Sequence, residues 1–365
     1  MPISRGDFSL GARNPQLEMF FYMSSARDDQ KPLIAITMGD PRGIGPEVVA
    51  KALARESLYR ICSPLILGDV RVLQKIIGKL GLAMKVAKAG RDLHFEPSPG
   101  LLAVLPLSDL PPEEGPGEIP GGLEGARASF LYAEEAGKMA MEGRVKAIAT
   151  GPVNKEAISR AGIPFAGHTE YFAGISGTKE FVMMLAGDRL KVALVTTHLA
   201  LNEVSKSLSE ERILSVIEIT GRGLQDYFGL RTPRIAVTAL NPHAGEGGLF
   251  GKEETIISRA VQRAGGRGFA ISGPWPADSL FHRAAQGEFD VVVCMYHDQG
   301  LIPLKLLHFD TAVNITLGLP FVRTSVDHGV AYDIAGKGVA SSRSMEEAIR
   351  LAAEMAGRKK RQMSE

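Results

Sequence analysis

One pattern recurs along the chain and constrains its fold more than any other feature. A short, continuous run of apolar and mostly β-branched residues ends at a polar residue or glycine, and a longer segment with helical spacing follows. Because these runs are continuous rather than alternating, each predicts a strand that is buried on both faces of a sheet. The predicted strands lie at 33–37, 65–67, 147–149, 192–196, 235–240 and 291–295.

The segments between these runs place apolar residues at helical spacing. Strands that alternate with helices form crossover units, which predict an α/β fold with a mainly parallel sheet and helices on both faces. The clearest predicted helices lie at 46–59, 126–142, 210–224, 253–264 and 345–358.

Length and composition limit the classes of protein to consider. A chain of 365 residues is long enough for two domains. The 42 basic and 41 acidic residues nearly cancel, so we expect no nucleic-acid partner. No run approaches the roughly 18 apolar residues of a membrane span, and Cys62 and Cys294 are the only cysteines. These features predict a cytoplasmic protein without a membrane partner. Residues 1–30 are predicted to be a flexible extension.

Three histidines, His198, His243 and His297, follow predicted strands directly or nearly so. In open parallel sheets, ligands bind beyond the carboxyl ends of strands. Three imidazoles that converge there would hold a divalent metal and leave positions open for a substrate. A single histidine at a strand end is more often a hydrogen-bonded loop residue, so the metal hypothesis depends on the three occurring together.

A second group of residues suits the binding of an anion. Lys305 and Arg323 lie in apolar surroundings, where a cation needs a partner such as a substrate phosphate, unless its charge reaches water. His168 and Thr169 follow Gly167, which allows close approach of the backbone, although a threonine before glutamate also suits an ordinary helix start. Asn314 would orient a substrate hydroxyl or begin a turn.

Two glycine-rich segments are candidates for a nucleotide site. Residues 39–47 follow the first strand and open a helix, but they lack the full GxGxxG spacing of the dinucleotide fingerprint. Residues 327–340 contain glycines that permit tight turns, and Asp333 in this segment could accept hydrogen bonds from a ribose diol. By composition alone, however, a polar loop is the better interpretation of this segment.

The chain resembles the 4-hydroxythreonine-4-phosphate dehydrogenase family from about Leu33 to about Met355. The blocks that carry the resemblance are MGDPRGIGPE (38–47), GPVNKEAI (151–158), GHTE (167–170), THLAL (197–201), NPHAGEGGLFGKEE (241–254), PADSLF (276–281), MYHDQGLIPLKLL (295–307) and VNITLGLPFVRTSVDHG (313–329).

The resemblance implies an enzyme of vitamin B6 biosynthesis that oxidises a small phosphorylated hydroxy amino acid with NAD or NADP. It implies one divalent metal (zinc, magnesium or cobalt) and a homodimer whose active site is shared between subunits. The metal ligands implied are His198, His243 and His297, and the substrate contacts implied are His168, Thr169, Lys305, Asn314 and Arg323. We expect the general base to be Asp278, Asp298 or metal-bound water.

The fold implied is that of isocitrate and isopropylmalate dehydrogenases, in which two α/β/α domains flank a cleft. We expect residues 31–140 and 300–365 to form the first domain, with the cofactor loop. Residues 141–299 would form the second, with the metal ligands and the dimer interface. Residues 328–340 are similar to the adenosine-binding loop of isopropylmalate dehydrogenases, which implies cofactor contacts at His328, Gly329, Asp333, Gly336 and Gly338.

Other functions remain open at this point. LIPLKLLHF (301–309) is close to the version found in a sister group that acts on D-threonate or D-erythronate 4-phosphate, so the same chemistry on that substrate is the nearest alternative. A metal-dependent phosphohydrolase would use the same three histidines but would have no use for the 328–340 segment. A non-catalytic phosphate-binding module would not need the histidines.

Overall fold

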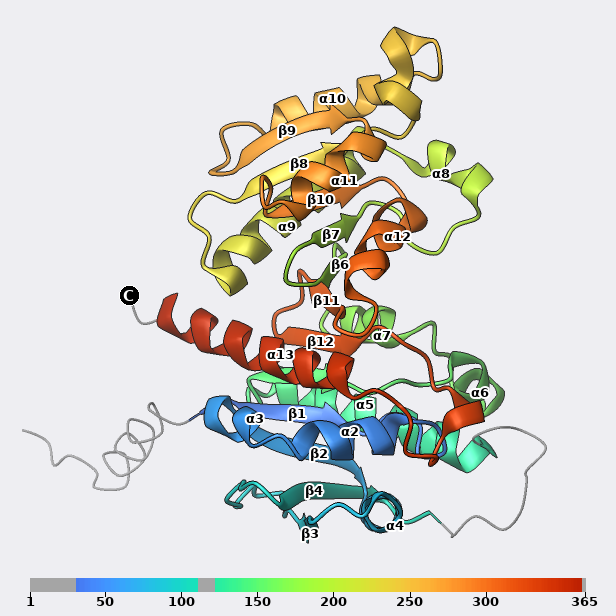
Figure 1. Cartoon of the computed structure of the whole chain (residues 1–365), viewed down its shortest axis with the longest axis vertical. Coiled ribbons are helices and arrows are strands. Elements are labelled where there is room, and N and C mark those ends of the chain that lie inside the picture. Colours follow the sequence, from blue (N-terminus) through green and yellow to red (C-terminus); the bar gives the residue numbers. More distant parts are fainter. Residues whose placement is uncertain (1–30, 111–121, 363–365) are drawn as a thin grey trace, which may run out of the picture. The chain divides into compact units, whose positions relative to one another are not determined.

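The computed structural model describes residues 31–110 and 122–362, so the predicted extension at 1–30 lies outside the described residues. In this part of the chain, the strands form one 12-stranded sheet in the order β3-β4-β2-β1-β5-β12-β11-β6-β7-β10-β8-β9 (Figure 1). The strands are β1 (Leu33–Thr37), β2 (Ser63–Asp69), β3 (Lys85–Lys88), β4 (Leu101–Ser108), β5 (Ala147–Thr150), β6 (Val182–Ala186), β7 (Lys191–Leu194), β8 (Arg234–Thr238), β9 (Ala270–Trp275), β10 (Val291–Cys294), β11 (Val313–Leu317) and β12 (Val322–Val326).

The six predicted strands are all present, as β1, β2, β5, β7, β8 and β10. The sheet is mixed, however, because three successive pairings at its centre, β12–β11, β11–β6 and β6–β7, are antiparallel. Residues 187–190 join β6 to β7, and residues 318–321 join β11 to β12. Connections this short can join antiparallel neighbours, whereas parallel neighbours need a long crossover. The fold is therefore α/β, as predicted. The antiparallel pairings at the centre of the sheet were not predicted.

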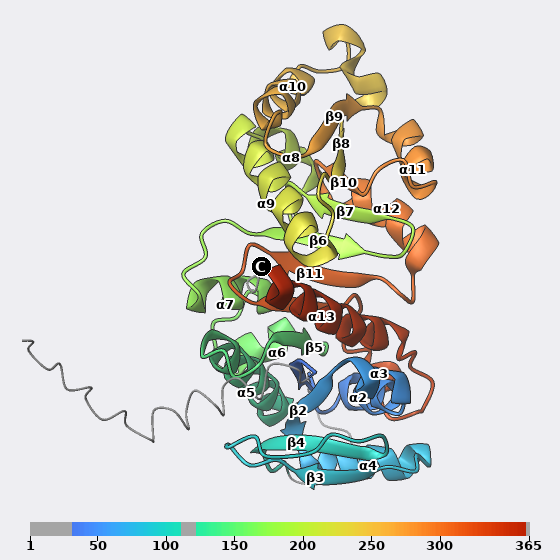
Figure 2. The same cartoon turned by 90° about the vertical axis from the view of Figure 1, so that its left-hand side faces the viewer.

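Helices cover both faces of the sheet. Figure 2 shows α5, α6 and α7 on one face of the strands around β5, and α2, α3 and α13 on the other. The helices are α2 (Gly45–Leu53), α3 (Glu56–Ile61), α4 (Val70–Leu80), α5 (Gly122–Met141), α6 (Lys155–Arg160), α7 (His168–Ile175), α8 (Leu201–Ser207), α9 (Glu210–Phe228), α10 (Glu253–Ala264), α11 (Ala277–Ala285), α12 (His297–His308) and α13 (Arg343–Gln362), with two 3₁₀ segments, η1 (Pro242–Gly248) and η2 (Tyr332–Ile334).

One predicted helix, 46–59, is wrong as a single element. The chain breaks into α2 and α3 because Arg55 takes an extended backbone conformation (φ −83°, ψ 110°). Leu53 and Leu58 are both buried, yet residues five apart lie about 140° apart around a continuous helix. The break allows both leucines to face the core.

Local signals account for the ends of other helices. Asp69 caps α4 by accepting hydrogen bonds from the backbone N–H groups of Arg71 and Val72, and Gly81 ends that helix in the left-handed region. None of the helices in the described ranges is both long and apolar enough to cross a membrane.

The arrangement of strands positions the predicted site residues. Strands β7, β10 and β8 are parallel neighbours, and these are the strands followed by the three histidines. Strand β5 pairs with β1 and β12, while α12 packs on β7 and β10. The division into domains at 31–140 with 300–365 and 141–299 stays a prediction.

Candidate active site

The ends of β7 and β10 form a cavity of about 430 Å³. Its two histidines, His198 and His297, lie with their ring centroids 5.7 Å apart. We call this cavity the imidazole pocket; it is lined by Thr197, His198, Leu199, Leu201, Val204, Tyr296, His297 and Asp298.

Asp298 orients one of the two imidazoles. Its Oδ1 lies 2.8 Å from Nδ1 of His297. Because an ionised carboxylate can only accept, a neutral His297 carries its proton on Nδ1 and leaves the lone pair of Nε2 free for a ligand. Burial lowers the pKa of His198, and the nearby positive charge of Lys155 and the His297 ring lower it further. The pocket therefore favours the neutral, ligating form of His198.

The third histidine is not brought into this pocket. His243 lies in η1, where its ring centroid is 6.5 Å from that of Phe250. Five consecutive residues from His243 to Gly247 take positive φ values between 44° and 77°. Within the described ranges, no three His, Cys, Asp or Glu side chains lie together in a way that could hold a metal ion.

Arg323 on β12 lies in a cage of hydroxyl groups. Only 3% of the residue is exposed. Its guanidinium donates to Thr150 Oγ1 at 2.9 Å, Thr316 Oγ1 at 3.0 Å and Thr169 Oγ1 at 3.3 Å. None of the ion pairs among the described residues includes Arg323, its Nε has no partner, and burial lowers its pKa to about 10. A buried cation with neutral partners is well suited to receive an anion.

Two further predicted contacts present unsatisfied atoms beside this cage. His168, at the start of α7, is buried and its Nε2 has no hydrogen-bond partner. Burial, Arg323 and Lys155 lower the pKa of His168 well below its ordinary value, so its ring is neutral. Asn314 lies two residues before Thr316 on β11, and its buried Oδ1 also has no partner. Such atoms commonly mark a ligand or an ordered water.

Lys305 already has a protein partner. Its ammonium lies 3.1 Å from Oδ2 of Asp327, and 38% of its side chain is exposed. Burial raises the pKa of Asp327, and the neighbouring Lys305 opposes that rise. The ammonium can therefore contact a substrate anion while it is paired with Asp327.

The predicted cofactor residues lie in one loop, 328–340, between β12 and α13. The Nε2 of His328 is buried without a partner, and the Asp333 side chain is exposed in η2. Gly336 and Gly338 take φ values of 68° and 77°, which side chains other than glycine rarely adopt.

Sequence reasoning missed several residues of the site. Thr150 and Thr316 hold Arg323, and Lys155 is close enough to His168 and His198 to lower the pKa of each. Lys155 lies within GPVNKEAI, one of the blocks that carries the resemblance, but its proximity to the histidines depends on the fold. Asp278, a predicted base, is exposed in the first turn of α11, and no hydrogen bond among residues 31–110 and 122–362 joins it to the site.

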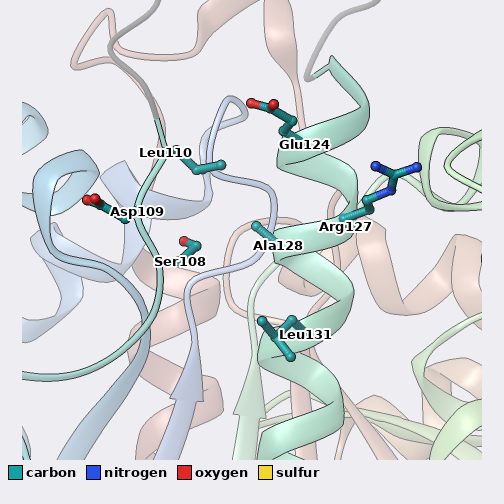
Figure 3. A pocket seen from close by; sticks show the side chains of 7 residues that line it. All are labelled: Ser108, Asp109, Leu110, Glu124, Arg127, Ala128 and Leu131. Atoms are coloured by element: carbon teal, nitrogen blue, oxygen red, sulfur yellow. The ribbon is translucent and has the colours of Figure 1, made fainter.

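A second cavity, of about 340 Å³, lies between the end of β4 and α5 (Figure 3). It contains none of the predicted site residues. Its Asp109 is paired with Arg71, with Oδ1 2.6 Å from Nε. This cavity therefore offers no comparable set of unsatisfied polar groups.

Comparisons with known proteins point to one family. Residues 60–352 match the family model described as pyridoxal phosphate biosynthetic protein PdxA. A 4-hydroxythreonine-4-phosphate dehydrogenase from Geobacter metallireducens is 50% identical over 327 residues, covering 89% of this chain and 96% of that protein. A D-threonate 4-phosphate dehydrogenase from Cupriavidus necator is 45% identical over 339 residues, covering 91% and 99%. The crystal structure of 4-hydroxythreonine-4-phosphate dehydrogenase from Klebsiella pneumoniae matches with a TM-score of 0.80 and 42% identity, covering 89% of this chain and 100% of that one.

Proposed function

Because the chain belongs to the PdxA family of pyridoxal phosphate biosynthetic proteins, we propose that it oxidises 4-phosphohydroxy-L-threonine with NAD or NADP. The product, 2-amino-3-oxo-4-phosphooxybutanoate, loses carbon dioxide to give 3-amino-2-oxopropyl phosphate in vitamin B6 biosynthesis. The observation that carries the proposal for this chain is the buried guanidinium of Arg323, whose hydrogen-bond partners in the described residues are all threonine hydroxyls. The reaction belongs in the cytoplasm, where the two buried cysteines, Cys62 and Cys294, would stay reduced.

The substrate's anionic groups bind where the unsatisfied donors are. Arg323 and Lys305 supply positive charge, and Thr169 supplies a hydroxyl. His168 is neutral, so its Nε2 donates or accepts according to its tautomer. Asn314 Oδ1 accepts a hydrogen bond from the substrate's hydroxyl or amino group. Together these side chains fix the substrate in one orientation before any bond breaks.

The donor set of the imidazole pocket fits a divalent metal, zinc, magnesium or cobalt. Burial favours the neutral ring of His198. A carboxylate that orients a ligating histidine, as Asp298 orients His297, is common at metal sites. His243 of the partner subunit completes the trio. A metal held there would supply a Lewis acid for the substrate's oxygen, and a bound nicotinamide would supply the hydride acceptor. Asp298 and Asp278 remain the candidates to take the hydroxyl proton.

A homodimer accounts for the exposed apolar side chains around the pocket. Leu201 lines the imidazole pocket and is 72% exposed, and Leu306 on α12 is 85% exposed. Leu249 and Phe250, which follow η1, are also exposed. Large apolar side chains that stay this exposed in a single chain are a reason to expect an interface. A second copy would cover it and bring η1 to the pocket of its neighbour. The two α/β/α domains, separated at about residues 140 and 300, would flank the cleft that holds the substrate.

The nearest alternative is the same oxidation of D-threonate 4-phosphate or D-erythronate 4-phosphate. It is favoured by the similarity to the Cupriavidus necator protein. The two substrates differ in configuration and in the amino group. The unsatisfied Oδ1 of Asn314 accepts a hydrogen bond from an amino group or from a hydroxyl group, so the assay with both substrates decides between them.

The proposal is tested by following the reduction of NAD and NADP with both substrates in parallel assays. We expect the higher kcat/KM with 4-phosphohydroxy-L-threonine, and loss of turnover after chelation that returns on addition of metal. A higher kcat/KM with D-threonate 4-phosphate would replace this function with the alternative. Release of phosphate without nicotinamide reduction would instead indicate a phosphohydrolase.

A further inference from the structure

A segment far away in the sequence holds the proposed cofactor loop. We call residues 40–51 the clamp segment and residues 328–340 the cofactor loop. The clamp segment includes most of α2, and the cofactor loop passes beside it between β12 and α13 (Figure 1). Contacts join the two at both ends of the loop.

The first contact is made by a buried ion pair. Glu47 is 0% exposed, and its carboxylate accepts hydrogen bonds from the backbone N–H of Ala340 at 2.9 Å and of Gly338 at 3.2 Å. Lys51 donates to Glu47 Oε1 and to the carbonyl oxygens of Gly338 and Ala340, each at 2.8 Å. A buried carboxylate costs stability unless it is fully paired. Here its partners are mainly backbone groups, so the pair fixes the path of the loop.

The second contact lies at the other end of the loop. Tyr332 donates its hydroxyl hydrogen to Asp40 Oδ2 at 2.5 Å, and Ile44 donates its N–H to the carbonyl oxygen of Val330 at 2.9 Å. Between these two attachment points, Ala331 takes a φ of 42°. A non-glycine residue in this region is strained and persists only when its surroundings enforce it. The clamp segment supplies that enforcement.

We propose that Asp40, Glu47 and Lys51 are positioning residues that hold the cofactor loop in the conformation that binds the nucleotide part of the nicotinamide cofactor. The inference rests on the proposed function, because it takes the loop to be the cofactor site. None of the three needs to touch the cofactor. They act through the loop's backbone, and a loop that is already ordered loses less conformational entropy when it binds a ligand.

Two variants test this inference, each targeting one end of the loop. Glu47→Gln retains the volume of the side chain but replaces the carboxylate, whose two oxygens accept the backbone N–H groups of Gly338 and Ala340, with a neutral amide. Tyr332→Phe removes only the hydroxyl group that donates to Asp40. Asp69→Asn is the matched control. Asp69 is also 0% exposed and also accepts backbone N–H groups, at Arg71, Val72 and Leu110, but it does not contact the cofactor loop.

We expect each test variant to raise the dissociation constant of the reduced cofactor by about tenfold. The dissociation constant would be measured by fluorescence titration. The KM of the phosphorylated substrate should stay within about twofold of wild type. Hydrogen exchange should become faster in peptides that cover the cofactor loop. Asp69→Asn should leave the cofactor dissociation constant unchanged, whatever its effect on melting temperature.

The inference is wrong, while the proposed function stands, if wild type reduces the cofactor but both test variants bind it as tightly as wild type. It also fails alone if the control weakens cofactor binding as much as the test variants do. If Glu47→Gln does not fold, Tyr332→Phe decides by the same criteria. A wild-type enzyme that binds no nicotinamide cofactor would overturn the proposed function and this inference together.

Discussion

Arg323 shows how one side chain can mark a binding site. Three threonine hydroxyls accept hydrogen bonds from its guanidinium, but its Nε has no partner and none of the ion pairs among the described residues includes it. A purely structural role would be served as well by an apolar residue, since replacing a buried charge with an apolar side chain is often neutral or stabilising. The positive charge of Arg323 is therefore best explained by a negatively charged ligand that binds beside it.

Replacement of Arg323 by lysine tests this explanation. Lysine keeps the charge but loses the planar fork that matches a phosphate or carboxylate. We expect kcat/KM for the phosphorylated substrate to fall about 10- to 150-fold, equivalent to about 1.5–3 kcal/mol. Steady-state kinetics would measure the fall, with the exposed Arg222→Lys as control. An unchanged kcat/KM would show that Arg323 does not bind the substrate.

His168 predicts a pH dependence of stability. Its pKa is lowered in the folded protein, chiefly by burial, whereas the unfolded chain takes up a proton near pH 6.5. The unfolded state therefore binds more protons below that pH, and stability falls as pH decreases, by at most about 1.4 kcal/mol per pH unit. We expect His168→Asn to show a shallower fall than wild type between pH 7 and pH 5, measured by urea unfolding. Equal slopes would contradict the assignment.

At the scale of elements, the sequence predicted strands most clearly where nearly every residue of the strand is apolar and buried. Strands such as β1 and β10 are continuous, nearly all-apolar runs. Such short runs, rich in β-branched residues, favour a buried strand over a helix. Strands β11 and β12 are also buried, but they contain Asn314 and Arg323. A charged residue argues against a buried strand until its partners are known, and the threonines that accept its hydrogen bonds come from β5, β11 and α7. Only the tertiary structure brings these threonines together around Arg323, so the sequence alone does not reveal them.

The left-handed turn in η1 is a second element that no sequence pattern revealed. Glu254 lies against this turn, and its Oε1 accepts the N–H groups of Leu240 and Asn241, just before η1, at 3.1 and 2.8 Å. This carboxylate anchors the two residues that lead into the turn, and we expect it to support the backbone at His243. A run of positive φ values would otherwise be unfavourable for the non-glycine residues.

Two glycine substitutions separate this contact from backbone strain. A methyl group at Gly245 would lie 2.6 Å from Glu254 Oε2, whereas one at Gly247, with a similar positive φ, would meet no atom within 4 Å. Gly247→Ala should therefore show only the strain of the left-handed region. Gly245→Ala should lower the free energy of unfolding by about 1–3 kcal/mol more. Equal losses in chemical denaturation would show that Glu254 does not support the turn.

At the scale of the whole molecule, the sequence predicted which residues lie at strand ends but not which of them meet. The proximity of His198 and His297 follows from β7 and β10 being parallel neighbours. The contact of Glu47 with Ala340 joins residues nearly 300 positions apart, and no local pattern encodes it. Within one chain His243 lies outside the imidazole pocket, and the proposal that a second subunit brings it there stays a prediction.

Replacement of Leu306 by aspartate tests the proposed assembly. This leucine is 85% exposed, so the change should leave the folded chain intact. A charge buried in a dimer interface would be strongly unfavourable. We expect sedimentation to show a dimer for wild type and a monomer for Leu306→Asp, which should also lose metal-dependent activity. Met141→Asp, on the exposed end of α5, is the control. A monomeric wild type that retains full activity would exclude a shared active site.

The reaction itself is tested most directly by its stoichiometry. Purified enzyme would be given 4-phosphohydroxy-L-threonine labelled in its carboxyl group, and reduced nicotinamide and released carbon dioxide would be measured in the same sample. An oxidation followed by decarboxylation predicts equal amounts of the two products, with the phosphate still on the organic product. Free phosphate appearing without reduced nicotinamide would contradict it.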